Sequence, residues 1–184
     1  MTVVTFSDLD DTLFQSPRRC QEISGHKVAV ELPGGAVGAY STPQQQALIS
    51  LLKNSCLIPV TGRRTESLSR IRVSFNGYKI TSHGAIILNA ENVLHPTWRI
   101  VLDEEEPKWC DRMSQLKSEL EEYVERCGVE LRVRVVNDQG YACYVCVKGD
   151  ASHLKRLKIG DGKINSEGFM VHLNDRNLAY MPPY

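Results

Sequence analysis

Short apolar runs alternate with helical segments in the first half of the chain. The apolar runs predict strands at 2–7, Cys56–Val60 and Tyr78–Ser82. Between them, Gln44–Lys53 and Thr65–Val73 are predicted to form helices. The run at 2–7 is apolar and β-branched without interruption, which predicts burial on both faces. Strands that alternate with helices in this way predict an α/β fold with a parallel sheet.

Residues 14–41 interrupt the alternation with scattered Gly and Pro and a β-rich piece at Lys27–Leu32, so we expect a hairpin or flap there. After residue 85 the pattern becomes that of an α+β module. Its predicted elements are a hairpin at Ile86–Leu88 and Val93–His95, a helix at Glu104–Arg126, strands at Val129–Val136 and Tyr141–Lys148, a helix at Ala151–Lys158, and a hairpin at Phe169–Asn174 and Leu178–Met181. We therefore expect two domains, 1–85 and 86–184.

The composition narrows the class of protein. The 184 residues are 42% hydrophobic and 24% charged, with 22 basic and 22 acidic side chains, which fits a soluble globular protein. A net charge of zero makes nucleic acid an unexpected main partner. No apolar run approaches the roughly 20 residues that span a bilayer, and no secretory signal is visible, so we expect no membrane partner. The six cysteines are expected to be reduced thiols in the cytoplasm.

The clearest chemical signal lies directly after the first predicted strand, where Asp8 and Asp10 are separated by one residue. Open α/β sheets bind ligands at the carboxyl ends of their strands. Two close carboxylates repel, and Mg²⁺ would offset that charge because it prefers oxygen ligands. One carboxylate could attack phosphorus while the other serves as acid and base. The plainer alternative is that these acids only cap a helix and line a loop.

A second half-site follows the strand Cys56–Val60. Thr61, Gly62 and Arg63 place a hydroxyl, a glycine and a guanidinium ahead of a predicted helix, which suits an anion such as phosphate. The third strand ends at His83-Gly84-Ala85, and His83 could line the substrate pocket or be held by a neighbouring loop.

The sequence Phe6-Ser7-Asp8-Leu9-Asp10-Asp11-Thr12-Leu13 resembles the first motif of the haloacid-dehalogenase-like (HAD) superfamily, and Thr61-Gly62-Arg63 resembles its second motif in the sucrose-phosphatase-like and Cof-like members. The resemblance implies a Rossmann-like parallel-sheet core with an inserted α+β cap. It implies Asp8 as nucleophile and magnesium ligand, and Asp10 as general acid/base that also contacts the metal. Thr12, Thr61, Gly62, Arg63 and His83 are the expected phosphate- and substrate-binding residues.

The resemblance covers only the front of the family's sequence, so the core is expected to be incomplete at its C-terminus. The family's core Lys and its later acidic motif have no counterpart up to Tyr184, and the segment 160–165 is expected to be a surface turn. Two functions follow. The first is Mg²⁺-dependent hydrolysis of a small phosphorylated metabolite, such as a sugar phosphate, through an aspartyl-phosphate. The second is phosphate or metabolite binding without catalysis. A phosphoacceptor receiver domain is disfavoured, because the later strands offer no acceptor Asp.

Overall fold

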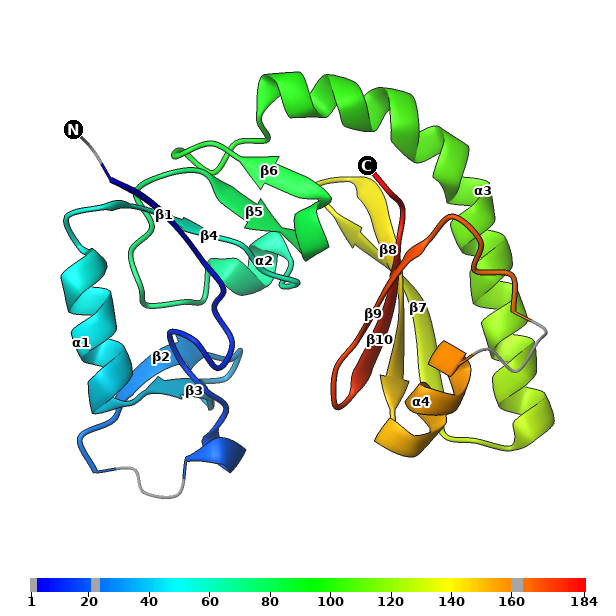
Figure 1. The fold of residues 1–184 in the computed structure, drawn as a ribbon, viewed down its shortest axis with the longest axis horizontal. Helices are drawn as coiled ribbons and strands as arrows, with labels where there is room; N and C mark the ends of the chain where they lie inside the picture. Colours follow the sequence, from blue (N-terminus) through cyan, green and yellow to red (C-terminus); the bar gives the residue numbers. More distant parts are fainter. Residues whose placement is uncertain (1–2, 21–23, 160–163) are drawn as a thin grey trace. The chain divides into compact units, whose positions relative to one another are not determined.

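The computed structural model describes residues 3–20, 24–159 and 164–184, and the chain forms two compact units, Met1–His95 and Pro96–Tyr184 (Figure 1). The sequence analysis placed a domain boundary near residue 85. In the structure, strand β6 (Ile86–Leu88) pairs with β5 (Lys79–Thr81) and so belongs to the first unit. The assignment of the two units as core and cap stays a prediction.

A parallel pair of strands forms the centre of the first unit. Strand β1 (Val4–Ser7) pairs with β4 (Cys56–Pro59), with Ser7 opposite Pro59. A parallel bridge between Val60 and Ile80 continues the arrangement toward β5. The predicted α/β fold with a parallel sheet is therefore confirmed.

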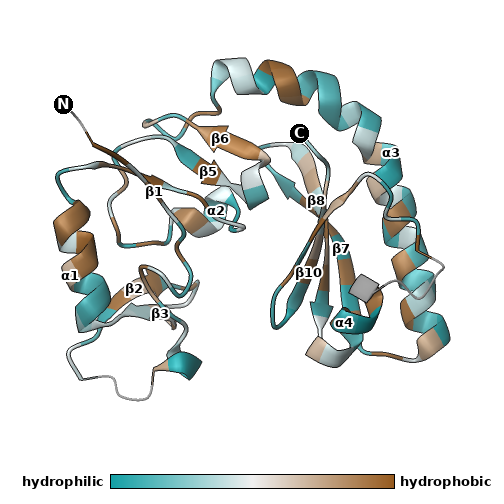
Figure 2. Cartoon of the chain, viewed as in Figure 1, coloured by the Kyte–Doolittle hydropathy of each residue, from teal (hydrophilic) through white to brown (hydrophobic). Residues whose placement is uncertain are grey.

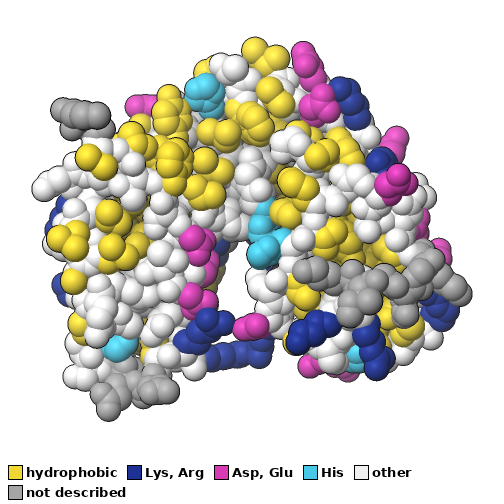
Figure 3. Space-filling model, in the orientation of Figure 1, with side chains coloured by type: hydrophobic (Ala, Val, Ile, Leu, Met, Phe, Trp, Pro, Cys, Tyr) yellow, Lys and Arg dark blue, Asp and Glu magenta, His cyan; other side chains and the backbone are white. Residues whose placement is uncertain are grey.

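Strand β1 is more exposed than its apolar sequence predicted. Val4 is 52% exposed and Phe6 is 63% exposed, and Figure 3 shows hydrophobic side chains gathered on the surface of the first unit. The expectation of burial on both faces is wrong for these described residues, because exposed Val4 and Phe6 alternate with half-buried Thr5 and Ser7, which leaves one face of β1 uncovered.

The predicted flap is an antiparallel hairpin of β2 (Lys27–Glu31) and β3 (Val37–Ser41), preceded by the 3₁₀ turn η1 (Pro17–Arg19). Helix α1 (Pro43–Leu52) follows and confirms the first predicted helix. A reciprocal capping box opens it, in which Thr42 accepts from the Gln45 backbone and the Gln45 side chain accepts from the Thr42 backbone.

Helix α2 is shorter than predicted. It spans only Thr65–Leu68, whereas the apolar spacing predicted a helix to Val73. The chain leaves the helix because it bonds to the flap instead: the Arg72 backbone N–H donates to Ala29, and Ile71 forms a bridge with Val30. Tertiary pairing thus overrides local helical preference here.

The second unit is a helix-covered antiparallel sheet. Its strands β7 (Leu131–Asp138), β8 (Tyr141–Gly149), β9 (Met170–Leu173) and β10 (Asn177–Met181) lie in the order β7-β8-β10-β9. Helix α3 (Pro96–Cys127) begins eight positions before the predicted start, with a proline at its first residue. Helix α4 (Ala151–Ile159) is the second helix. The predicted α+β pattern is confirmed.

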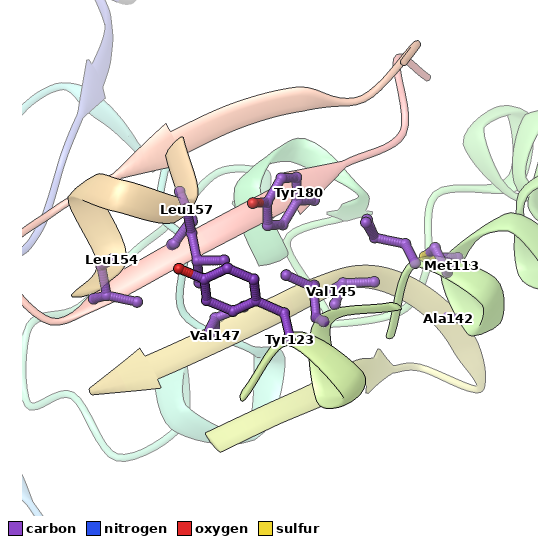
Figure 4. Close-up of a cluster of buried hydrophobic side chains, with 11 residues drawn as sticks. Met113, Tyr123, Ala142, Val145, Val147, Leu154, Leu157 and Tyr180 are labelled. Carbon is purple, nitrogen blue, oxygen red and sulfur yellow. The ribbon is translucent and has the colours of Figure 1, made fainter. Parts of the chain in front are cut away.

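Both helices of this unit contribute to one apolar core. Leu116, Leu120 and Leu154 are at most 1% exposed and pack with side chains from β8 and β10 (Figure 4). Hydrophobic and hydrophilic residues alternate along α3 accordingly (Figure 2). In the first unit a separate cluster gathers around Leu9, Leu13 and Phe14, all 0% exposed.

Candidate functional site

The loop after β1 is folded around buried leucines. The Thr12 and Leu13 backbone N–H groups both donate to the Leu9 carbonyl, and Leu9 and Leu13 are fully buried. Asp11 has a positive φ of 65°, a conformation that Asp tolerates better than most residues. Asp8, directly before Leu9, and Asp10, between the two leucines, both lie on the exposed side of this loop.

Asp8 lies at the tip of β1 and is exposed. The Thr12 hydroxyl Oγ1 donates to its carboxylate Oδ2 at 3.3 Å. The Asp8 carboxylate is thus oriented by its own loop and remains accessible to a ligand.

Asp10 is bound by Arg63, the last residue of the Thr61-Gly62-Arg63 segment. Arg63 donates from Nε to Asp10 Oδ2 at 2.8 Å and from its terminal nitrogen to Oδ1 at 2.6 Å. The guanidinium also lies 5.2 Å from the centroid of the Phe14 ring. Such a two-pronged contact fixes the planes of both groups. Arg63, which the sequence analysis assigned to phosphate, therefore holds Asp10 in this structure.

Thr61 follows β4 and is 5% exposed. Its backbone N–H donates to Ile80, and its hydroxyl oxygen accepts the Arg63 backbone N–H at 3.1 Å. The His83 backbone N–H donates to the Thr61 carbonyl at 3.1 Å. The expected helix opening comes slightly later than the motif, since α2 begins at Thr65.

The ring of His83 packs directly against Gly62. A Cβ atom at position 62 would lie 2.5 Å from both Cε1 and Nε2 of His83, closer than any ordinary contact. His83 has a positive φ of 61° in the 3₁₀ turn η2 (Ser82–Gly84), so its backbone conformation is also unusual for a residue with a side chain.

The register of the parallel pair brings these groups to one edge of the sheet. The Val60 backbone N–H donates to the Ser7 carbonyl at 2.8 Å, so Asp8 and Thr61 each follow directly on bonded neighbours. Every residue predicted for the site belongs to this edge: Asp8, Asp10, Thr12, Thr61, Gly62, Arg63 and His83. Their catalytic and binding roles stay predictions.

Two residues near the site were missed by sequence reasoning. Phe14 lies beneath the Arg63 guanidinium, and Arg19 donates to Asp11 at 2.6 Å. Asp11 is thus paired with Arg19, eight positions along the chain, and no local sequence signal pointed to this contact. Residues 160–163 of the predicted surface turn at 160–165 lie outside the described residues.

A divalent cation would have few protein ligands at this edge. No cluster of three or more His, Cys, Asp and Glu side chains suited to a metal occurs within 3–20, 24–159 and 164–184. Mg²⁺ is commonly held by one or two carboxylates together with water and substrate phosphate, so the Asp8 carboxylate and the Asp10 backbone carbonyl would be its expected protein ligands here.

The predicted order of elements is present: a parallel sheet with an acidic loop after its first strand and Thr-Gly-Arg after the next, followed by a helix-and-sheet unit. No protein-family model and no curated protein matches the sequence. No helix in the described part of the chain is long and apolar enough to cross a membrane.

Three solved structures share this fold. A trehalose-6-phosphate phosphatase related protein matches with a TM-score of 0.50 and 16% identity over 97% of this chain and 67% of its own. The C-terminal domain of trehalose-6-phosphate phosphatase from C. albicans matches with a TM-score of 0.55 and 12% identity, over 100% of this chain and 58% of its own. IMP-nucleotidase from Plasmodium falciparum, solved with bound IMP, matches with a TM-score of 0.54 and 12% identity, over 98% of this chain and 52% of its own. The chain thus spans between about half and two thirds of their lengths. The expected HAD resemblance is confirmed for the fold.

Proposed function

We propose that this protein is a Mg²⁺-dependent phosphomonoester hydrolase that acts on a small phosphorylated metabolite through an aspartyl-phosphate on Asp8. The observation that carries the proposal is the position of Asp8, exposed at the tip of β1 and beside the strand that leads into Thr61. A nucleophile needs access to phosphorus and neighbouring groups for the phosphoryl oxygens, and this edge offers both.

The chemistry divides between the two acids. An Asp8 oxygen attacks phosphorus, the bond from phosphorus to the leaving oxygen breaks, and Asp10 protonates that oxygen. Asp10 then removes a proton from water, which hydrolyses the acyl phosphate and restores Asp8.

Arg63 has to change partners in this scheme. While Arg63 donates to both oxygens of the Asp10 carboxylate, that carboxylate is not free to contact the leaving oxygen. An arriving phosphate carries more negative charge than Asp10 and can accept the same paired N–H donors. We therefore infer that substrate draws Arg63 from Asp10, which both binds the phosphate and frees the acid.

Magnesium would be held by the Asp8 carboxylate and by Asp10. When bound, the ion withdraws charge from the transferring phosphoryl group and reduces the repulsion between the two acids. Thr61, with the loop at Gly62, is suited to the phosphoryl oxygens.

The substrate class follows by analogy from the structures of similar fold, which are named for trehalose 6-phosphate and IMP. Both are phosphate monoesters of hydroxyl-bearing small molecules. A fold of this kind hosts many substrates, so the proposal extends only to that chemical class.

The test is hydrolysis of para-nitrophenyl phosphate with and without Mg²⁺. Asp8→Asn removes the nucleophile at constant size and is expected to lower turnover by about 10³-fold or more. Asp11→Asn is the matched control, because Asp11 lies in the same loop but pairs with Arg19, and Asn tolerates its positive φ. Equal turnover in wild type and Asp8→Asn would refute the assignment.

The second function, phosphate binding without catalysis, has one observation in its favour. Asp10 is tied to Arg63, and the described residues offer no third metal-binding side chain beside Asp8. It predicts no Mg²⁺-dependent turnover, together with a rise in Tm in inorganic phosphate that Thr61→Val abolishes.

A further inference from the structure

A cavity of about 420 Å³ lies within the first unit, lined by the hairpin of β2 and β3, by helix α1 and by the segment 72–76. Small-molecule sites have volumes of about 300–1,000 Å³, so the cavity is large enough for a ligand. It is separate from the acidic loop, because Asp8, Asp10 and Thr61 are not among its lining residues. It reaches β4 at Leu57, near the start of the strand, whereas Thr61 follows the end of that strand.

The cavity exists because the chain after α2 does not continue as a helix beside α1. The Arg72 backbone N–H donates to the Ala29 carbonyl at 2.8 Å, which ties the segment 72–76 to β2. Asn76 Oδ1 accepts the Leu57 backbone N–H at 3.0 Å, which ties the same segment to β4. A loop held in this way is narrower than a helix, which is about 10–12 Å across, so room remains beside α1.

Much of the cavity wall is apolar. Ala29 and Leu57, which are 3% and 4% exposed, contribute to it. The half-buried side chains of Ile49, Leu52 and Val73 complete it, and they pack only partly against the core of the first unit. An apolar group that covers these side chains removes their exposed surface from water, which is favourable.

The buried hydroxyl groups of this wall already have partners. Ser41 Oγ donates to the Leu13 carbonyl at 3.0 Å, and Ser55 Oγ donates to the Leu52 carbonyl at 2.8 Å. The Asn76 side-chain nitrogen donates to the Ser55 carbonyl at 3.2 Å. Polar groups that are satisfied within the protein require no polar partner from a ligand. We therefore expect the part of a ligand that enters the cavity to be apolar.

The charged side chains of the cavity are basic. Lys27, Lys53 and Arg72 line it, and no acid among the described residues does so. Arg72 is paired with the Glu31 carboxylate, whereas no ion pair joins Lys27 or Lys53 to any described residue. Exposed positive charge beside an apolar wall favours an anion. A carboxylate, which carries one charge, is less costly than a doubly charged phosphate to move from water to such a wall.

We propose that this cavity binds a small apolar molecule that carries one carboxylate group. The apolar part covers Ala29, Ile49 and Leu57, and the carboxylate accepts from the ammonium groups of Lys27 and Lys53. This site goes beyond the proposed hydrolase activity, and its test does not depend on the chemistry of the acidic loop.

The test is titration of the full chain with octanoate at constant ionic strength, followed through the backbone amide resonances. Saturable shifts are expected at the amides of Ala29, Ile49 and Leu57. Octanamide has the same apolar chain without the charge, and it is expected to bind about fivefold more weakly or worse. Inorganic phosphate has the charge without the apolar chain, and it is expected to leave these amides unshifted.

Substitution of the lysines tests the contact with the carboxylate. Lys27→Gln and Lys53→Gln are each expected to weaken octanoate binding by about two- to fivefold, as for exposed ion pairs, and the double variant by about tenfold. Lys53→Arg keeps the charge and should retain the affinity. Arg18→Gln is the matched control, because exposed Arg18 belongs to η1 and does not line the cavity. Unchanged amide resonances of each free variant, away from the substituted residue, separate loss of a ligand contact from loss of folding.

The proposal is overturned if octanoate does not shift the amides of Ala29, Ile49 and Leu57, if octanamide binds as tightly as octanoate, or if inorganic phosphate alone shifts the same amides. It is also overturned if the double variant of Lys27 and Lys53 binds octanoate as tightly as the wild type.

Discussion

The contact between Asp10 and Arg63 offers a quantitative test of how the site is built. Both N–H···O bonds are short, at 2.6 and 2.8 Å, and the two side chains are 53% and 24% exposed. Exposed ion pairs contribute about 0.2–1 kcal/mol, and a two-pronged geometry belongs at the upper end of that range. We therefore expect a coupling energy of about 1 kcal/mol between the two side chains.

The two single substitutions should lower the stability of the first unit by unequal amounts. Asp10→Asn loses the ion pair, at a cost of about 1 kcal/mol. Arg63→Gln loses the pair and also the contact with the Phe14 ring, which adds about 0.5–1 kcal/mol. The double variant should be less destabilised than the sum of the two by the coupling energy.

The assay has to report on the first unit. Both tryptophans, Trp98 and Trp109, lie in the second unit, so their fluorescence does not follow the site. Native-state hydrogen exchange at the Val60 amide, which donates to Ser7 across the parallel pair, measures the opening of the first unit.

A second cycle on Asp11 and Arg19 is the control. That pair has a single 2.6 Å bond and both side chains are about half exposed, so its coupling should be about 0.5 kcal/mol or less. Near 1 M salt, where the screening length is about 3 Å, both couplings should shrink. A coupling near zero for Asp10 and Arg63 at low salt, or one no larger than the control, would refute the reasoning.

Three further predictions concern packing and titration. Gly62→Ala should cost about 1–3 kcal/mol in urea unfolding, and adding His83→Ala should recover most of it; no recovery would contradict the close approach. Leu120→Ala should lower the stability reported by tryptophan fluorescence by about 2–5 kcal/mol, whereas Ile100→Ala, at a 59% exposed position of the same helix, should cost almost nothing. Burial raises the pKa of Tyr180 to about 12 from an unfolded value of 10.0. The stability that the folded state gains from keeping this phenol neutral is therefore fully present below pH 10 and is lost toward pH 12. Tyr180→Phe should remove roughly 1–3 kcal/mol of that alkaline loss, measured as the difference between the two stability–pH curves; identical curves would contradict the burial effect.

Local patterns were sufficient for much of the fold. The apolar runs before Asp8 and Thr61 form paired parallel strands, and the residues around Lys27–Leu32 form the expected hairpin. These features depend on neighbouring residues in the chain. The adjacency of the two motifs also followed from the sequence, because parallel strands end at the same edge of a sheet.

Contacts between residues far apart in the chain could not be predicted from local sequence patterns. The pairing of Asp10 with Arg63 crosses 53 positions and depends on how two loops fold. Helix α2 ends early because its continuation bonds to Ala29 of the flap. The placement of Arg132 directly opposite Lys148 was equally hidden, because it depends on the register between β7 and β8.

The central claim is that Asp8 accepts the phosphoryl group. Rapid mixing with para-nitrophenyl phosphate and Mg²⁺, followed by acid quench and mass spectrometry of peptides, measures this directly. The account predicts one phosphoryl group on the peptide that contains Asp8, removed by hydroxylamine and absent from Asp8→Asn. Turnover that persists in Asp8→Asn, or a phosphoryl group on a different residue, would contradict it.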